Sequence, residues 1–118
     1  MSKLFIASIA TVLIFVVVIA CSKDSGGSNN MVDCSTVAAK SFSADVQPIV
    51  TSVCATSSCH AAGSINGPGA LTNYSQVAAN KTVIRIAIAN GTMPQGTSLT
   101  AAQKNSFLCW IDNGALNN

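Results

Sequence analysis

Two cysteines and the only histidine of the chain lie within the seven-residue segment CATSSCH, residues 54–60. The chain continues as AAGSINGPGALT, so residues 55–72 are mostly small residues and turn formers that oppose regular structure. So long a loop is uncommon in a small domain unless cross-links or a bound group order it. Cys54, Cys59 and His60 have the chemistry to fix this loop, and the domain must fold around it.

The N-terminal segment has the layout of an export signal. Lys3 precedes a long apolar run that ends at Cys21, and such segments are excluded from fold reasoning. The run is also nearly long enough to span a bilayer, so an uncleaved membrane anchor is the alternative. Its end, VIAC, resembles the lipobox of bacterial lipoproteins, whose cysteine is lipidated and becomes the first mature residue. We therefore expect residues 1–20 to be a lipoprotein signal peptide and Cys21 to carry the lipid.

This resemblance implies that a lipid anchors the protein to a membrane of the cell envelope, facing the periplasm or the exterior. Ser22 is compatible with sorting to the outer membrane. Residues 21–33 are rich in Ser, Gly and Asn and are interpreted as a flexible tether. Signal removal leaves 118 − 20 = 98 residues, and residues 34–118 are enough for one small domain. A core of this size usually needs help from disulfides, a metal or a cofactor.

Charge and residue content exclude several classes of function. Beyond residue 20 the chain has five Lys or Arg and four Asp, a net charge of 5 − 4 = +1, and no basic cluster, which argues against a nucleic-acid partner. The chain contains no glutamate, so catalysis by paired carboxylates has almost no acids to use. Cys59 and His60 are sequence neighbours, which rarely orient as nucleophile and base. We therefore expect a protein that is not an enzyme.

The first predicted helix covers residues 45–53, where apolar side chains recur at i, i+3, i+4 and i+7. Ser43 is the candidate N-cap, and Asp45 lies in the first turn, where the helix dipole favours it. Pro48 is compatible only with a position near the start, so this helix is predicted to be short.

Two further runs complete an all-α domain of short helices and long loops. The run NYSQVAANKTVIRIAIANG predicts one or two helices with Ser75 as a cap and its last glycine as the end, while a strand over its β-branched part is the competing interpretation. The last helix is the clearest, because Thr100 and Gln103 form a capping box and Gly114 is placed to end it.

The adjacent pair Cys59–His60 satisfies the strict part of the geometry for covalent haem attachment. A c-type haem is held by two cysteine thioethers, and the histidine after the second cysteine binds the iron. The familiar motif has two residues between its cysteines, whereas four residues separate Cys54 from Cys59. The longer loop can bulge and still bring Cys54 to the other vinyl group.

The chain resembles a small monohaem cytochrome c domain found on bacterial lipoproteins. The matching segments, in order, are FSADVQPIV, CATSSCH, GTMPQG and LTAAQKNSFLCWIDNGALNN, which cover most of residues 42–118. The resemblance implies a cytochrome c-like fold in which the helix before the haem motif packs against the C-terminal helix. It implies one covalent haem c on Cys54 and Cys59, with His60 as the proximal and Met93 as the distal iron ligand. It also implies single-electron transfer in the envelope to or from a redox partner protein.

The inventory of ligand types agrees with this assignment. Because His60 is the only histidine, two histidine ligands from the chain are excluded, and beyond the signal segment the only methionines are Met31 and Met93. Met31 lies in the tether. Thioether ligation favours reduced iron, which suits an electron carrier.

Other interpretations of the motif remain open. Cys54 and Cys59 could form a disulfide in an exported domain, which would make the protein a haem-free, disulfide-stapled lipoprotein with a binding or structural role. A zinc site could combine Cys54, Cys59 and His60 with Cys34 or Cys109, although export disfavours free thiolates.

Four residues outside the motif are assigned mainly structural roles. Once Cys21 is given to lipid, we expect a disulfide between Cys34 and Cys109 that ties the start of the domain to its last helix. Trp110 is expected in the core or at a haem edge, with a hydrogen bond to a haem propionate as the weaker alternative. Arg85 is expected at a solvated helix position, although it could also serve a propionate.

Overall fold

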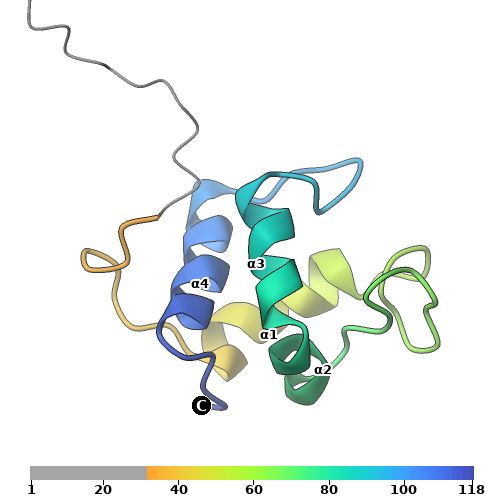
Figure 1. Cartoon of the computed structure of the whole chain (residues 1–118), viewed down its shortest axis with the longest axis horizontal. Helices are drawn as coiled ribbons and strands as arrows, with labels where there is room; N and C mark the ends of the chain where they lie inside the picture. Colours follow the sequence, from red (N-terminus) through yellow and green to blue (C-terminus); the bar gives the residue numbers. More distant parts are fainter. Residues whose placement is uncertain (1–31) are drawn as a thin grey trace, which may run out of the picture.

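The computed structural model describes residues 32–118 (Figure 1). The expected signal peptide, the lipidated Cys21 and most of the tether lie outside these described residues. The helical elements in chain order are η1 (Phe42–Val46), α1 (Gln47–Ile49), η2 (Val50–Cys54), α2 (Tyr74–Ala79), α3 (Lys81–Ala89) and α4 (Ala101–Asp112).

The prediction of an all-α domain is confirmed for the described part of the chain, which contains no strand. The run that could have formed a strand is α3. The helix before it, α2, is capped by the Asn73 side chain and not by Ser75, which lies inside the helix. Two long loops, residues 55–73 and 90–100, separate the helices and extend to the same side of the molecule in Figure 1. None of the helices in residues 32–118 is long and apolar enough to cross a membrane.

The first helical stretch differs from the prediction because Ser41, not Ser43, caps it. The Ser41 hydroxyl accepts a hydrogen bond from the Ala44 N–H at 3.1 Å, and the Ser41 N–H donates to the Asp45 carboxylate at 2.8 Å. The stretch η1–α1–η2 is continuous over residues 42–54 and contains Pro48 well inside it. Proline has no N–H to donate, and the turns on either side are widened to i→i+5 hydrogen bonds. The helix therefore runs past Pro48 and carries Cys54 at its end.

Local signals set the ends of α3 and α4 as predicted. The Thr100–Gln103 capping box starts α4, and Gly114, with a φ of 101°, follows its C-cap. Gly91, with a φ of 71°, ends α3 in the same way, and the next amide, that of Thr92, donates to the carbonyl of the last helical turn. The motif at Gly91 turns the chain directly into the loop that contains Met93.

The core is built around α4. Phe107, Leu108 and Trp110 are at most 1% exposed. The Trp110 ring lies 5.4 Å from the Phe42 ring of η1 and 6.3 Å from the Tyr74 ring at the start of α2, measured between centroids. Helix α4 therefore packs against the stretch that leads into the CATSSCH segment, and it also lies beside α3 (Figure 1).

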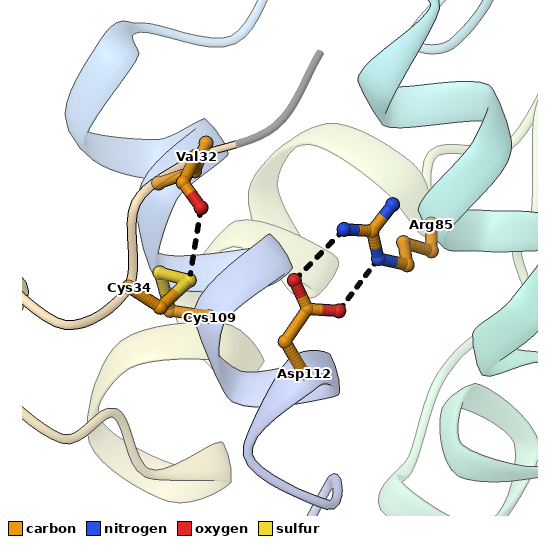
Figure 2. A network of polar contacts seen from close by, with 5 residues as sticks. All are labelled: Val32, Cys34, Arg85, Cys109 and Asp112. Atoms are coloured by element: carbon orange, nitrogen blue, oxygen red, sulfur yellow. Dashed lines mark hydrogen bonds and ion pairs between the residues drawn. A yellow bond between two sulfur atoms is a disulfide. The ribbon is translucent and has the colours of Figure 1, made fainter. Parts of the chain in front are cut away.

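Two cross-links attach other segments to α4, and Figure 2 shows both. A disulfide joins Cys34 to Cys109, which is the pairing expected from the sequence. Arg85 of α3 makes a two-pronged ion pair with Asp112, with Nε 2.6 Å from Oδ1 and Nη2 2.8 Å from Oδ2. The N-terminal segment of the domain and α3 are thus both fastened to one helix.

We predict that Asp112→Asn removes an acid-sensitive contribution to stability. Hydrogen bonding from Arg85 holds the pKa of Asp112 below its ordinary value of 3.8. A lowered carboxyl pKa stabilises the fold above its unfolded value, and this stabilisation is lost as the pH falls through the folded-state pKa. The pair is about one-third exposed, so screening limits the expected difference between wild type and variant to about 1 kcal/mol near pH 6, shrinking toward zero near pH 2. Urea unfolding of both proteins across this range measures it, and a difference that does not change with pH would contradict the prediction.

Candidate functional site

One cavity of about 740 Å³ brings together all four residues that the sequence selected as ligands. Cys54, Cys59, His60 and Met93 all line it, although they come from the end of η2, the loop after it and the loop after α3. Its volume is within the range of about 300–1,000 Å³ that is usual for small-molecule and cofactor sites. The apolar part of its wall includes Val53, Leu71, Val83, Ile84, Ala87, Ile88 and Leu99.

His60 is fixed in the wall of this cavity by three hydrogen bonds and is only 6% exposed. Its N–H donates to the Cys54 carbonyl at 3.0 Å, and its carbonyl accepts from the Leu71 N–H at 2.8 Å. The ring atom Nδ1 lies 2.8 Å from the Gly69 carbonyl oxygen. A carbonyl can only accept, which assigns the ring proton to Nδ1 and leaves a lone pair on Nε2. Histidines that bind metals are oriented in this way, with the other ring nitrogen donating to an oxygen.

The loop after His60 folds back and supports the motif through Asn66. The Asn66 amide donates to the Ser58 and Cys59 carbonyls, both at 3.0 Å. The same loop supplies the Gly69 carbonyl to His60, with Gly69 in a left-handed conformation at a φ of 102°. The NGPG pattern indicated a turn, but its support of Cys59 and His60 was missed because these contacts form only when the loop closes.

The two cysteine thiols of the motif differ in their surroundings. Cys54 and Cys59 are not bonded to each other in the structure. Burial, with a smaller contribution from the nearby Cys59, raises the pKa of the Cys54 thiol to about 11. Hydrogen bonds from the Thr56 and Ser58 side chains lower the pKa of Cys59. Cys59 is therefore the more readily ionised thiol of the pair.

Met93 lines the cavity from the loop that follows α3. Helix α3 ends at Ala89, and the amides of Thr92 and Met93 both donate to the Ala87 carbonyl, at 2.9 and 3.3 Å. These bonds fold the chain back over the end of α3 and hold the Met93 backbone there. Met93 is partly buried and lines the same cavity as His60.

The main expectation for Trp110, burial in the core, is confirmed. Its indole N–H donates to the Leu116 carbonyl at 2.8 Å, and the ring does not line the cavity. The Arg85 guanidinium is paired with Asp112, and Arg85 does not line the cavity either. Both polar groups therefore have partners within the protein, and nothing supports the weaker alternative of a propionate partner.

The zinc interpretation finds no support in the described part of the chain. Its fourth ligand was to come from Cys34 or Cys109, and these two are bonded to each other. Residues 32–118 also contain no group of three or more His, Cys, Asp or Glu side chains arranged to hold a metal ion.

The fold and the cavity define a small all-α domain with two thiols, an imidazole and a thioether around one apolar space. No protein-family model matches the chain, and no curated protein and no solved structure is significantly similar to it. The function must therefore be argued from the chemistry of the cavity.

We predict that Cys59 reacts with iodoacetamide much faster than Cys54 in the protein without a bound cofactor. Alkylation requires the thiolate, and the pKa of about 11 at Cys54 leaves very little thiolate near neutral pH. The difference in rate should be at least about a hundredfold. Peptide mapping by mass spectrometry measures both rates, and unfolding in urea should bring them close together. Equal rates in the folded protein would show that the two thiols do not differ as described.

Proposed function

We propose that the protein is a membrane-tethered monohaem c-type cytochrome that carries single electrons in the cell envelope. The observation that supports the proposal best is the convergence of Cys54, Cys59, His60 and Met93 on one cavity, although they span 93 − 54 = 39 positions of the chain. Two thiols beside an imidazole and a thioether are the set that a covalent haem with two axial ligands requires.

Each of the four residues, and the apolar wall around them, has a role in binding a haem. Cys54 and Cys59 would form the two thioethers, and Nε2 of His60 and the Met93 sulfur would bind the iron. When bound, the haem supplies an iron centre that accepts and releases one electron. The apolar side chains of the wall suit the ring of such a group, and His60 is already oriented by the Gly69 carbonyl.

The unusual spacing of the two cysteines is absorbed by a turn. The Cys59 N–H donates to the Thr56 carbonyl at 3.0 Å, and the His60 N–H donates to the Cys54 carbonyl at 3.0 Å. The second bond brings the backbone of His60 against that of Cys54, so the extra residues form a bulge and do not separate the two ends of the motif. This geometry supports attachment through a motif with four intervening residues.

The proposed role is that of a carrier and not of an enzyme. If His60 and Met93 both bound the iron, the chain would supply both of its protein ligands and would leave no site on the iron for a substrate. Within the described residues, the wall of the cavity includes no Asp, Glu, Lys or Arg that could act on a substrate as an acid or base.

The proposed site of action follows from the N-terminal segment. Lipidation at Cys21 would anchor the domain to an envelope membrane, through a tether long enough to let it approach a redox partner protein. Nothing in the charge pattern favours a nucleic-acid partner.

We predict that the protein acquires one covalently bound haem when it is produced together with haem-maturation machinery. Intact mass should rise by the mass of one haem, and the reduced-minus-oxidised absorption spectrum should show a sharp α-band that persists after denaturation. A double variant, Cys54→Ser with Cys59→Ser, is the control and should carry no covalent haem. A colourless wild-type protein that is lighter by two hydrogens at Cys54 and Cys59 would instead establish the haem-free, disulfide-stapled module.

We predict further that Met93→Ala abolishes the low-spin spectrum of the reduced protein. Without the Met93 sulfur the iron would lack its distal ligand, whereas Cys54, Cys59 and His60 would still hold the haem. Met31→Ala is the matched control, because Met31 lies in the tether, and its spectrum should equal that of wild type. An unchanged spectrum in Met93→Ala would mean that another group is the distal ligand.

A further inference from the structure

Helix α3, which leads into the Met93 loop, is fastened to α4 by polar contacts at two points. Arg85 pairs with Asp112 near the end of α4, with N–O distances of 2.6 and 2.8 Å. One residue before the C-cap of α3, the Ala89 carbonyl accepts a hydrogen bond from the Lys104 ammonium group at 3.1 Å. The two helices run in opposite directions (Figure 1), so the Arg85–Asp112 pair (Figure 2) and the Lys104–Ala89 contact lie at different heights along one interface.

Apolar packing holds only part of α3. Ile84 and Ile88 are buried in the core, whereas Val83 and Ile86 are 51% and 54% exposed. Val83, Ile84 and Ile88 also line the cavity. Packing between apolar side chains is not directional, whereas the charged pair and the capped carbonyl have defined geometry.

The position of α3 determines the position of the Met93 backbone. The Ala87 carbonyl receives the amides of Thr92 and Met93 and the Thr92 hydroxyl, at 2.9, 3.3 and 3.2 Å. The Met93 backbone must therefore move with the last turn of α3. His60 is held from the other side of the cavity, by Cys54 and Gly69. The distance between His60 and Met93 therefore depends on where α3 lies along α4.

We propose that Arg85, Asp112 and Lys104 are positioning residues that fix α3 on α4 and thereby hold Met93 in place for iron ligation. The inference rests on the proposed function, in which Met93 is the distal ligand. None of the three residues lines the cavity, so they act on the site only through Met93.

Another ion pair of the domain provides a matched control. Lys40 and Asp45 are 3.4 Å apart and 23% and 28% exposed, close to the 31% and 32% of Arg85 and Asp112. Lys40 lies before η1 and Asp45 lies within it, and the Asp45 carboxylate bonds to Lys40 and to the Ser41 N–H, not to a residue of α3. Its loss should affect stability to a similar extent without reaching Met93.

The test compares Asp112→Asn and Lys104→Met with Lys40→Met in the full chain. In the ferric haem-loaded protein, imidazole competes with Met93 for the iron, and its dissociation constant is followed by absorption. A less firmly held Met93 should be displaced more easily, so imidazole should bind roughly threefold to tenfold more tightly to Asp112→Asn and Lys104→Met. Lys40→Met should stay within about twofold of wild type.

A second readout does not depend on haem. Hydrogen exchange at the Thr92 and Met93 amides, measured on the protein as isolated, should be faster in Asp112→Asn and Lys104→Met and unchanged in Lys40→Met. Imidazole affinity equal to wild type in both test variants, with or without a change in unfolding free energy, would overturn the positioning role. Unchanged exchange would overturn it as well. A protein that never acquires haem would refute the proposed function instead, and the exchange measurement would still decide whether the three residues hold Met93.

Discussion

The burial of α4 is the interaction on which the rest of the domain depends. Phe107, Leu108 and Trp110 are almost fully enclosed, and Phe42 packs on Trp110. Three other parts of the domain are connected to this helix. The helical stretch before the CATSSCH segment lies against it through η1, the N-terminal segment is bonded to it at Cys109, and α3 is paired with it at Asp112. Yet α4 contributes no side chain to the cavity wall. Helix α4 instead holds the helical stretch that ends at Cys54 and helix α3, which both line the cavity, in their relative positions.

The cavity lies beside the core and not inside it. Leu71, Ile84 and Ile88 line the cavity, yet each is at most 8% exposed because each also belongs to the buried core. In the proposed function, a haem would add contacts on the cavity side of these residues. It would also contact both long loops, which are unusual in so small a domain.

Most helix ends were predictable from the sequence, and so was the Cys34–Cys109 disulfide, because few cysteines were left to pair. Contacts between backbone groups of distant segments were not predictable. The ends of α4 follow from Thr100, Gln103 and Gly114, because caps are formed by residues within one turn of the helix. The cap at Ser41 was missed because Ser41 and Ser43 are chemically alike and only the fold separates them. Ser43 instead binds the Asn118 carbonyl, 75 residues away. The candidate ligands could be chosen from their chemistry.

The supports of those ligands could not be predicted in the same way. Asn66 and Gly69 have no property in the sequence that distinguishes them from ordinary turn residues. Their role depends on a loop that folds back onto the motif. The contact from Lys104 to the Ala89 carbonyl likewise depends on the packing of two helices and involves a backbone atom that every residue has. Sequence chemistry thus identifies groups that can bind, whereas their orientation is a property of the tertiary structure.

In the proposed function, two features of the cavity act on the iron in the same direction. A thioether ligand from Met93 favours reduced over oxidised iron. The wall of the cavity adds no charge among the described residues, since Arg85 and Lys104 are engaged with α4 and α3 and lie outside it. Oxidised iron carries one more positive charge, and an apolar, uncharged wall offers that charge no partner. An electron on the iron would therefore be held more firmly than in a hydrated or acidic site. Such a carrier would pass its electron only to an acceptor of higher potential.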